Sequence, residues 1–256
     1  MIDLRQRLGR LGLLLFGLVL MGLVVGPLRG PAELLVAVMS GANKLKPIYA
    51  VDTPEAKIAI SFDACWGAEH TPTLLAILKQ HNIKTTFFLV NIWLEKYPEL
   101  AKAIVAEGHE LGLHSASHPD FAQLSEEQME KELRENKEAI ERITGFQPIL
   151  FRPPFGSYNN TLIRLTQRMG LHPIQWDVDS LDWKDLSARQ MEERVLSRVK
   201  KGSIVLFHNN GKHTAEALPG ILQGLQGRGY QIVPVSELIY QDNYYVDVNG
   251  IQRKQP

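Results

Sequence analysis

Residues 57–81, KIAISFDACWGAEHTPTLLAILKQH, hold the pattern that decides the fold. The apolar run KIAISF predicts a buried strand, and Leu74, Leu75 and Leu78 after it recur at helical spacing. TTFFLV at 85–90 is again typical of a strand, and residues 98–107 show a second helical pattern that Gly108 should end. This alternation of strand and helix predicts a parallel sheet with helical crossovers.

The alternation continues to residue 240. Further strands are predicted at HELGLH (109–114), ILF (149–151), HPIQW (172–176), SIVLF (203–207) and YQIVPV (230–235), with helices near 159–169, 187–200 and 215–227. Ser125 and Gln128 form a capping-box signal for a long helix that reaches Thr144, with Gly145 behind it. About seven strand–helix units predict an α/β fold with a closed or nearly closed barrel.

The N-terminal segment differs from the rest of the chain. Residues 1–10 carry Arg5, Arg7 and Arg10, and residues 11–28 are uncharged and mainly apolar, which is just long enough to span a membrane. Basic residues before a span stay in the cytoplasm, so we expect a single-pass anchor with everything downstream outside the cytoplasm. A cleaved signal segment is the alternative, and the domain would then be secreted. Residues 29–56 are expected to form a tether, 57–240 the domain and 241–256 a C-terminal tail.

Composition narrows the class of protein. The 28 basic and 28 acidic residues give a formal net charge of +0, which argues against nucleic-acid binding. The single cysteine, Cys65, excludes an intrachain disulfide framework and a metal site built from several cysteines. We expect a monomer.

Polar residues follow the predicted strands at the point where each strand ends. They are Asp63, His114 with His118, Arg152, Asp177 and His208. In a barrel of parallel strands these ends share one face, and that face carries the active site. Taken singly, each residue has an ordinary structural reading, such as a helix cap for Asp63. Their joint placement favours a functional site.

The residue types at this face predict a chemistry. His114 and His118 can bind one metal ion and leave positions open for water and substrate. Asp63 can act as a base, and His208 can protonate a leaving amine, with Asp182 favouring its charged form. Arg152 can hold a carboxylate by paired hydrogen bonds. Together these groups predict hydrolysis of an amide or an ester.

Five segments in this order, SFDACWG, HSASHP, RPPFG, DSLDW and LFH, resemble the five motifs of the polysaccharide deacetylase family. This family is also known as the NodB-homology or carbohydrate esterase family 4 group, and the sporulation-type deacetylases show the strongest resemblance. The resemblance implies a distorted (β/α) barrel, a divalent metal such as zinc, and removal of N-acetyl groups from a cell-wall polysaccharide such as peptidoglycan. It also implies a role in sporulation.

The resemblance assigns a role to each matching position. Asp63 matches the base, His114 and His118 the metal ligands, and Arg152 the residue that orients the base. Phe155 matches an aromatic residue whose backbone N–H helps to bind the oxyanion. His208 matches the acid that donates the proton, and Asp182 matches the aspartate that adjusts the pKa of this acid. Trp183 matches a tryptophan at the side of the substrate groove, and Leu206 matches a residue that lines the acetate pocket.

One position departs from the family. In the family, a second aspartate directly follows the base and serves as the third metal ligand. Ala64 stands at this position, so the metal has only two protein ligands unless another group takes the place of the aspartate. Cys65, Glu69 and His70 lie nearby, and Cys65 is expected to be a small packed residue at the strand end. Two other functions therefore stay open: an envelope glycan-binding protein with weak or no catalysis, and the same chemistry on another acyl group.

Overall fold

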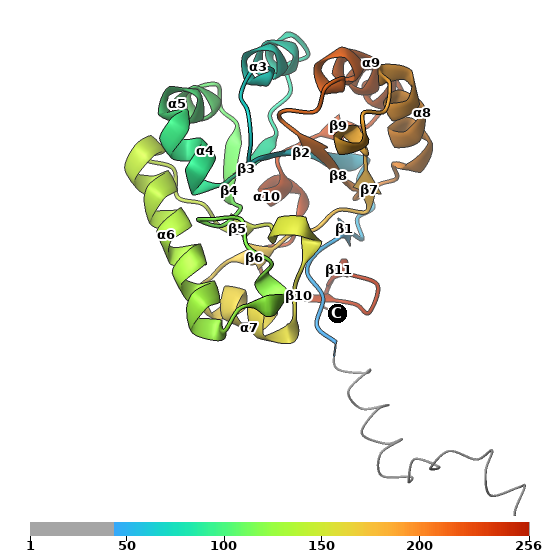
Figure 1. The fold of residues 1–256 in the computed structure, drawn as a ribbon. Helices are drawn as coiled ribbons and strands as arrows, with labels where there is room; N and C mark the ends of the chain where they lie inside the picture. The colour runs from blue at the N-terminus through green and yellow to red at the C-terminus, as the bar shows by residue number, and fades with distance from the viewer. Residues whose placement is uncertain (1–43, 256) are drawn as a thin grey trace, which may run out of the picture. The chain divides into compact units, whose positions relative to one another are not determined.

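The structure is a computed structural model that describes residues 44–255 (Figure 1). The predicted basic segment and membrane anchor, at 1–10 and 11–28, lie outside the described residues. Within 44–255, no helix has the length and apolar character needed to cross a membrane. Residues from Leu45 onward form one compact unit.

The central feature of this unit is a curled sheet in which every strand pair is parallel, as predicted. Seven strands follow the order β6-β5-β4-β3-β2-β8-β7, and β9 pairs with the start of β2. Their bounds are β2 Lys57–Ala64, β3 Thr86–Leu89, β4 Glu110–Leu113, β5 Leu150–Phe151, β6 His172–Pro173, β7 Val178–Asp179, β8 Ile204–His208 and β9 Gln231–Ile232.

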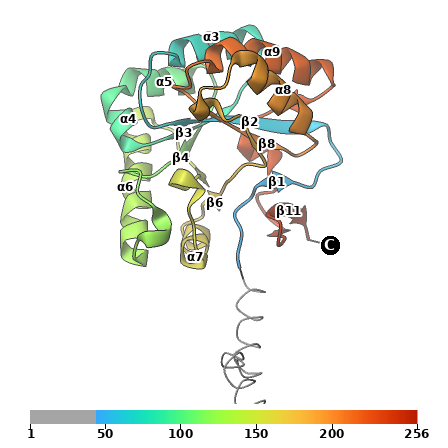
Figure 2. The same cartoon turned by 45° about the vertical axis from the view of Figure 1, so that its right-hand side comes forward.

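The helices α3 to α9 lie outside the curl of the sheet (Figures 1 and 2). They are α3 Thr71–Gln80, α4 Asn91–Lys96, α5 Pro98–Ala106, α6 Glu126–Thr144, α7 Asn160–Arg168, α8 Ala188–Arg198 and α9 Thr214–Gly227. A short helix, α10 (Val235–Leu238), begins where the Val235 N–H donates to Thr86 Oγ1 at the start of β3. It therefore covers the amino ends of the strands and leaves their carboxyl ends clear.

Helix α6 shows how closely local sequence fixes an element. The Ser125 hydroxyl accepts from the Gln128 N–H, and the Gln128 side chain accepts from the Ser125 N–H. At the other end Gly145 has φ 73, a left-handed conformation that glycine adopts without steric cost. Both predicted ends of this helix are confirmed.

Strand β2 separates two apolar clusters because side chains alternate between the faces of a strand. Ile58, Ile60, Phe62 and Ala64 belong to the cluster between the sheet and the outer helices. Ala59 belongs to the smaller cluster that includes Ile48, Phe88 and Ile174. Asp63 shares the parity of Ala59, so it lies on the face opposite to Ala64.

The barrel is not closed by the parallel strands alone, since β6 and β7 are the two ends of their order. Ile48 bridges to Ile174 beside β6, and Ala50 bridges to Ser203 before β8. The strand β1 (Ala50–Val51) then pairs with β11 (Ile251–Lys254), which pairs with β10 (Tyr244–Val246). This second sheet is built from segments in which no strand was predicted.

Candidate active site

The predicted site residues meet at the carboxyl ends of the strands, around a cavity of about 570 Å³. Those lining it are Asp63, His114, His118, Phe155, Asp182, Trp183, Leu206 and His208. Asp63 and His208 are register partners on the neighbouring strands β2 and β8, so their backbones lie side by side. Arg152, just beyond β5, reaches the same group through its contact with Asp63.

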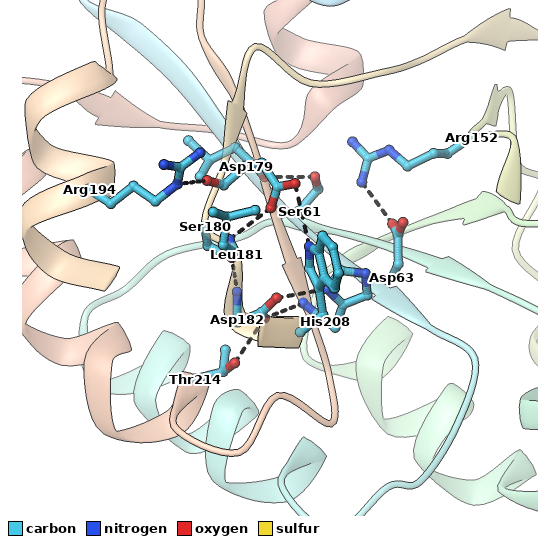
Figure 3. Close-up of polar contacts among 12 residues, drawn as sticks. Ser61, Asp63, Arg152, Asp179, Ser180, Leu181, Asp182, Arg194, His208 and Thr214 are labelled. Carbon is cyan, nitrogen blue, oxygen red and sulfur yellow. Dashed lines mark hydrogen bonds and ion pairs between the residues drawn. The ribbon is translucent and has the colours of Figure 1, made fainter. Parts of the chain in front are cut away.

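Asp63 and Arg152 form a buried ion pair. The Arg152 Nη1–H donates to Asp63 Oδ1 at 2.8 Å (Figure 3). The guanidinium lies 4.1 Å from the centroid of the Phe88 ring. Burial alone would raise the pKa of Asp63, but the charges of Arg152, His114 and His208 outweigh it and hold the pKa below its usual value. Asp63 is therefore ionised at neutral pH and able to accept a proton.

His114 is fixed with one ring nitrogen facing the cavity. Its Nδ1–H donates to the Arg152 carbonyl at 2.7 Å, so Nε2 keeps its lone pair, and Nε2 lies 3.6 Å from Asp63 Oδ2. Burial lowers the pKa of His114, and burial together with His114 lowers the pKa of His118 to about 4. Both imidazoles are neutral near pH 7, which is the form that binds metal ions.

Asn136, which the sequence reading missed, holds this part of the site from α6. Its side-chain oxygen accepts from the His114 N–H at 2.9 Å, while its amide donates to the Leu89 carbonyl and to Asn91. Asn136 is fully buried among the apolar residues Leu133 and Ile140 of the same helix. A polar residue within the apolar stripe of an amphipathic helix is the signal that would have identified it.

His208 and Asp182 form the second polar pair. The His208 Nδ1–H donates to Asp182 Oδ1 at 2.7 Å, and the His208 N–H and the Thr214 hydroxyl both donate to Asp182 Oδ2 (Figure 3). Burial lowers the pKa of His208, but the hydrogen bond and charge of Asp182 outweigh it and raise the pKa above its usual value. His208 therefore differs from His114 and His118 in favouring its protonated form.

Cys65 is buried, with 8% of its surface exposed, as expected for a packed residue, yet it also lines the cavity. Its sulfur and one nitrogen of each of His114 and His118 all lie within 4.8 Å of one another. Burial and the Asp63 charge raise the pKa of the thiol. Glu69 instead accepts from the Ala68 N–H, and neither it nor His70 is among the residues lining the cavity.

Aromatic side chains form the rim. Phe155, Trp183 and Trp66 are 73%, 56% and 55% exposed, and all three line the cavity. The Phe155 ring lies edge-on to His118, with centroids 4.6 Å apart. Both residues have a left-handed backbone, with φ 58 and φ 61, a strained conformation that clusters at functional sites.

The structure corrects the placement of Asp177. Its N–H donates to the Ile204 carbonyl, and its carboxylate accepts from the Ile204 N–H and the Ser203 hydroxyl. It therefore lies at the start of β8, away from the carboxyl ends, because HPIQW and the residues after it form two short strands with a bend between them. Asp179, two residues further, lines the cavity instead.

The comparisons with known proteins agree with this arrangement. The family model for polysaccharide deacetylase matches residues 50–174. A peptidoglycan-N-acetylglucosamine deacetylase of Bacillus cereus is 34% identical over 199 residues, which cover 75% of this chain and 72% of that protein. The uncharacterized protein YlxY of Bacillus subtilis is 33% identical over 194 residues, 76% of this chain, and the chain spans only 60% of its length.

A solved structure adds a different kind of relative. A pseudoenzyme of carbohydrate esterase family 4 from Bacillus anthracis is 31% identical, with a TM-score of 0.73 over 82% of this chain and 73% of that one. A mutant of that pseudoenzyme has restored enzymatic activity. Since the Bacillus cereus enzyme is matched over more than two thirds of its length and the five motifs meet at one cavity, this chain belongs to the polysaccharide deacetylase family.

Proposed function

We propose that the protein removes N-acetyl groups from amino sugars of cell-wall peptidoglycan. The observation that carries this proposal is the placement of Asp63 and His208 side by side on neighbouring strands, where both line one cavity and each is bound to a partner of opposite charge type. Against the opposite effect of burial, Arg152 lowers the pKa of Asp63 and Asp182 raises the pKa of His208. Two groups whose surroundings push their pKa values apart supply a base and an acid at the same pH.

The residues of the cavity fit a divalent metal ion. His114 presents Nε2 to the cavity because its other nitrogen is held by a backbone carbonyl, and this arrangement is typical of metal-binding histidines. His118 lies beside it, with ring centroids 5.1 Å apart. A bound zinc ion would polarise the acetamide carbonyl and favour ionisation of water. The two histidines are the proposed ligands, and zinc is the metal that this set of donors favours.

The remaining side chains supply proton transfer and binding. Asp63 takes a proton from the attacking water, and Arg152 keeps its carboxylate in one orientation. His208 gives a proton to the nitrogen of the leaving amine, while Asp182 fixes its tautomer. The Phe155 N–H is the proposed donor to the oxygen on which negative charge develops.

Sugar binding is assigned to the rim. Trp183 and Trp66 offer flat apolar faces beside the cavity, and Leu206, 2% exposed, closes its floor where the acetyl methyl group would lie. Both tryptophans are more than half exposed, so a polymer outside the cavity can contact them. We propose an N-acetylated peptidoglycan strand as the substrate.

The location is proposed from the sequence. Residues 11–28 would anchor the chain, with residues 1–10 in the cytoplasm and the domain outside it, where peptidoglycan lies. Monomeric state and a role in sporulation are proposed with it. Protease treatment of intact protoplasts tests the orientation: residues after 28 should be digested, and protection of the domain would contradict the proposal.

Acetate release from peptidoglycan and N-acetylglucosamine oligomers, with and without added zinc or cobalt, tests the activity. Asp63→Asn should reduce turnover by about 100- to 10,000-fold, the usual contribution of a general base. Asp177→Asn is the matched control, because Asp177 is a carboxylate of the same sheet that lies away from the cavity. Equal activity of Asp63→Asn and the wild type would remove Asp63 as the base.

The second candidate function is glycan binding without turnover. The Bacillus anthracis pseudoenzyme supports glycan binding without turnover as an alternative, because that protein has this fold and is 31% identical to the chain. Ala64 supports it as well, because an alanine cannot bind a metal ion. Binding of glycan oligomers without acetate release under every metal tested would establish this function in place of the first.

A further inference from the structure

We propose that Cys65 is the third protein ligand of the metal, in the place of the carboxylate that Ala64 lacks. This inference concerns the metal site of the proposed deacetylase, but it depends on metal binding and not on turnover. It rests on three observations: the direction of the side chains along β2, the closeness of three donor atoms, and the surroundings of the cysteine.

The first observation is the alternation of side chains at the end of β2. Ala64 is fully buried in the cluster between sheet and helices, together with Phe62, Leu89 and Leu113. Its methyl group therefore points away from the cavity, and a longer side chain there would enter the apolar layer. Asp63 and Cys65, one residue to either side, both line the cavity. The inward-facing position after the base is 65 in this chain.

The second observation is the distance between donors. The sulfur of Cys65 and one nitrogen of each of His114 and His118 lie within 4.8 Å of one another. Around a tetrahedral zinc ion such donors lie about 3.4–3.6 Å apart, given bonds of about 2.3 Å to sulfur and 2.0–2.1 Å to nitrogen. Closing the site shortens these separations by at most about 1.2–1.4 Å. Cys65 lies just beyond β2 and His118 in a loop, so both can make this movement.

The third observation is the setting of Cys65. Asp63 is engaged by Arg152 at 2.8 Å, so its carboxylate is already committed to an ion pair. The loop after Cys65 is held in place, because the Gly67 carbonyl accepts from both Trp93 Nε1 and Asn209 Nδ2. These bonds hold the backbone at Gly67, two residues beyond Cys65, and leave the Cys65 side chain free to adjust.

Binding would replace the S–H bond of Cys65 by a sulfur–metal bond and release one proton to solvent, with no change of oxidation state. A ligand set of one thiolate and two imidazoles leaves a fourth position open, as a hydrolytic site requires. A thiolate in place of a carboxylate also makes the site softer. We expect it to prefer zinc, cobalt and cadmium over magnesium and manganese.

Cobalt(II) titration of the full chain, stripped of metal with a chelator, tests the proposal. A thiolate ligand gives cobalt a charge-transfer band in the near ultraviolet, and Cys65 is the only cysteine in the chain, so the band reports this residue alone. Cys65→Ser should remove the band and weaken zinc binding about 100-fold or more, since even outer-shell changes cost roughly 10- to 100-fold. Circular dichroism checks that the variant is folded.

The outcomes separate this proposal from the proposed function. Cobalt bound to the wild type without a charge-transfer band would overturn the ligand role of Cys65, and so would the absence of cobalt and zinc binding. Either result leaves acetate release to be judged by its own assay. A charge-transfer band in a protein that releases no acetate from any glycan would support the ligand and count against the deacetylase.

Discussion

Substitution of Ala64 by aspartate tests the direction of the strand on which the metal site depends. Because the family has an aspartate at this position as a metal ligand, Ala64→Asp is expected at first sight to restore that ligand. In this fold it should instead destabilise the protein, because Ala64 is 0% exposed and packs in the apolar cluster with Phe62 and Leu89. A carboxylate confined there is kept in its neutral form.

The magnitude follows from the proton that this aspartate must hold. Its pKa in the unfolded chain is about 3.9, so keeping it neutral at pH 7 costs about 1.36 kcal/mol per pH unit, or about 4 kcal/mol. At pH 5 the same cost is about 1.5 kcal/mol. Because the folded state binds a proton that the unfolded state releases, the free energy of unfolding should fall as the pH rises from about 4. The larger side chain adds a pH-independent loss of about 1–3 kcal/mol.

Urea unfolding in the presence of a chelator, at pH 5 and pH 7, measures the effect. Ala64→Asn is the matched control, since asparagine has nearly the same shape and does not titrate. The difference between the two variants at pH 7 should be about 4 kcal/mol and should shrink at pH 5. An aspartate variant as stable as the asparagine variant at both pH values, with tighter zinc binding, would show that position 64 faces the cavity and refute the argument.

Three further predictions concern the acid, a buried histidine and the rim. Asp182→Asn should lower the pKa of His208, which Asp182 raises, so the loss of activity on the alkaline side should move to lower pH. An alkaline limb of the pH profile at the wild-type position would exclude His208 as the acid. His109, whose pKa burial lowers to about 4, takes up its proton more readily when unfolded, so its stabilising effect is lost as the pH falls from about 6.5 to 4. The His109→Asn variant keeps an acceptor for the Thr85 N–H. Over this pH range its free energy of unfolding, measured with urea, should fall by about 3 kcal/mol less than that of the wild type. An equal fall in both proteins would contradict the assignment of this effect to His109. Trp66→Ala and Trp183→Ala should each raise the KM for glycan oligomers about tenfold and leave kcat unchanged, and a loss confined to kcat would count against a binding role.

The features predicted from the sequence are those fixed by local patterns. Helix α6 begins and ends at the residues that its capping box and Gly145 predict, because each end is satisfied by groups within four residues of it. The side chains at the ends of β2, β4 and β8 meet as predicted, since parallel strands place their carboxyl ends together. The roles of Asp63, His114, His118, Arg152 and His208 in catalysis stay predictions.

The features that were missed depend on contacts between distant segments. The strands β10 and β11 form because β11 pairs with β1, about 200 residues earlier in the chain. The sequence of so short a strand contains no local pattern that predicts this pairing. Asn136 acts on His114 from α6 through a single hydrogen bond across the core. Whether Cys65 or Ala64 faces the cavity depends on where β2 stops being a strand, and strand ends are the least predictable part of a sequence.

The two polar pairs bear on whether the site is catalytic. A buried ion pair such as Arg152–Asp63 brings a desolvation cost that apolar residues of similar size would avoid, and it is weak evidence for stability. Asp182 is also buried, and its carboxylate accepts hydrogen bonds from three donors. A histidine with only a structural role would need a single acceptor oxygen for its ring N–H. A protein that only bound glycan could use the aromatic rim without either pair. The two pairs therefore support the proposed proton transfer at the cavity, since they shift the pKa values of Asp63 and His208 in opposite directions.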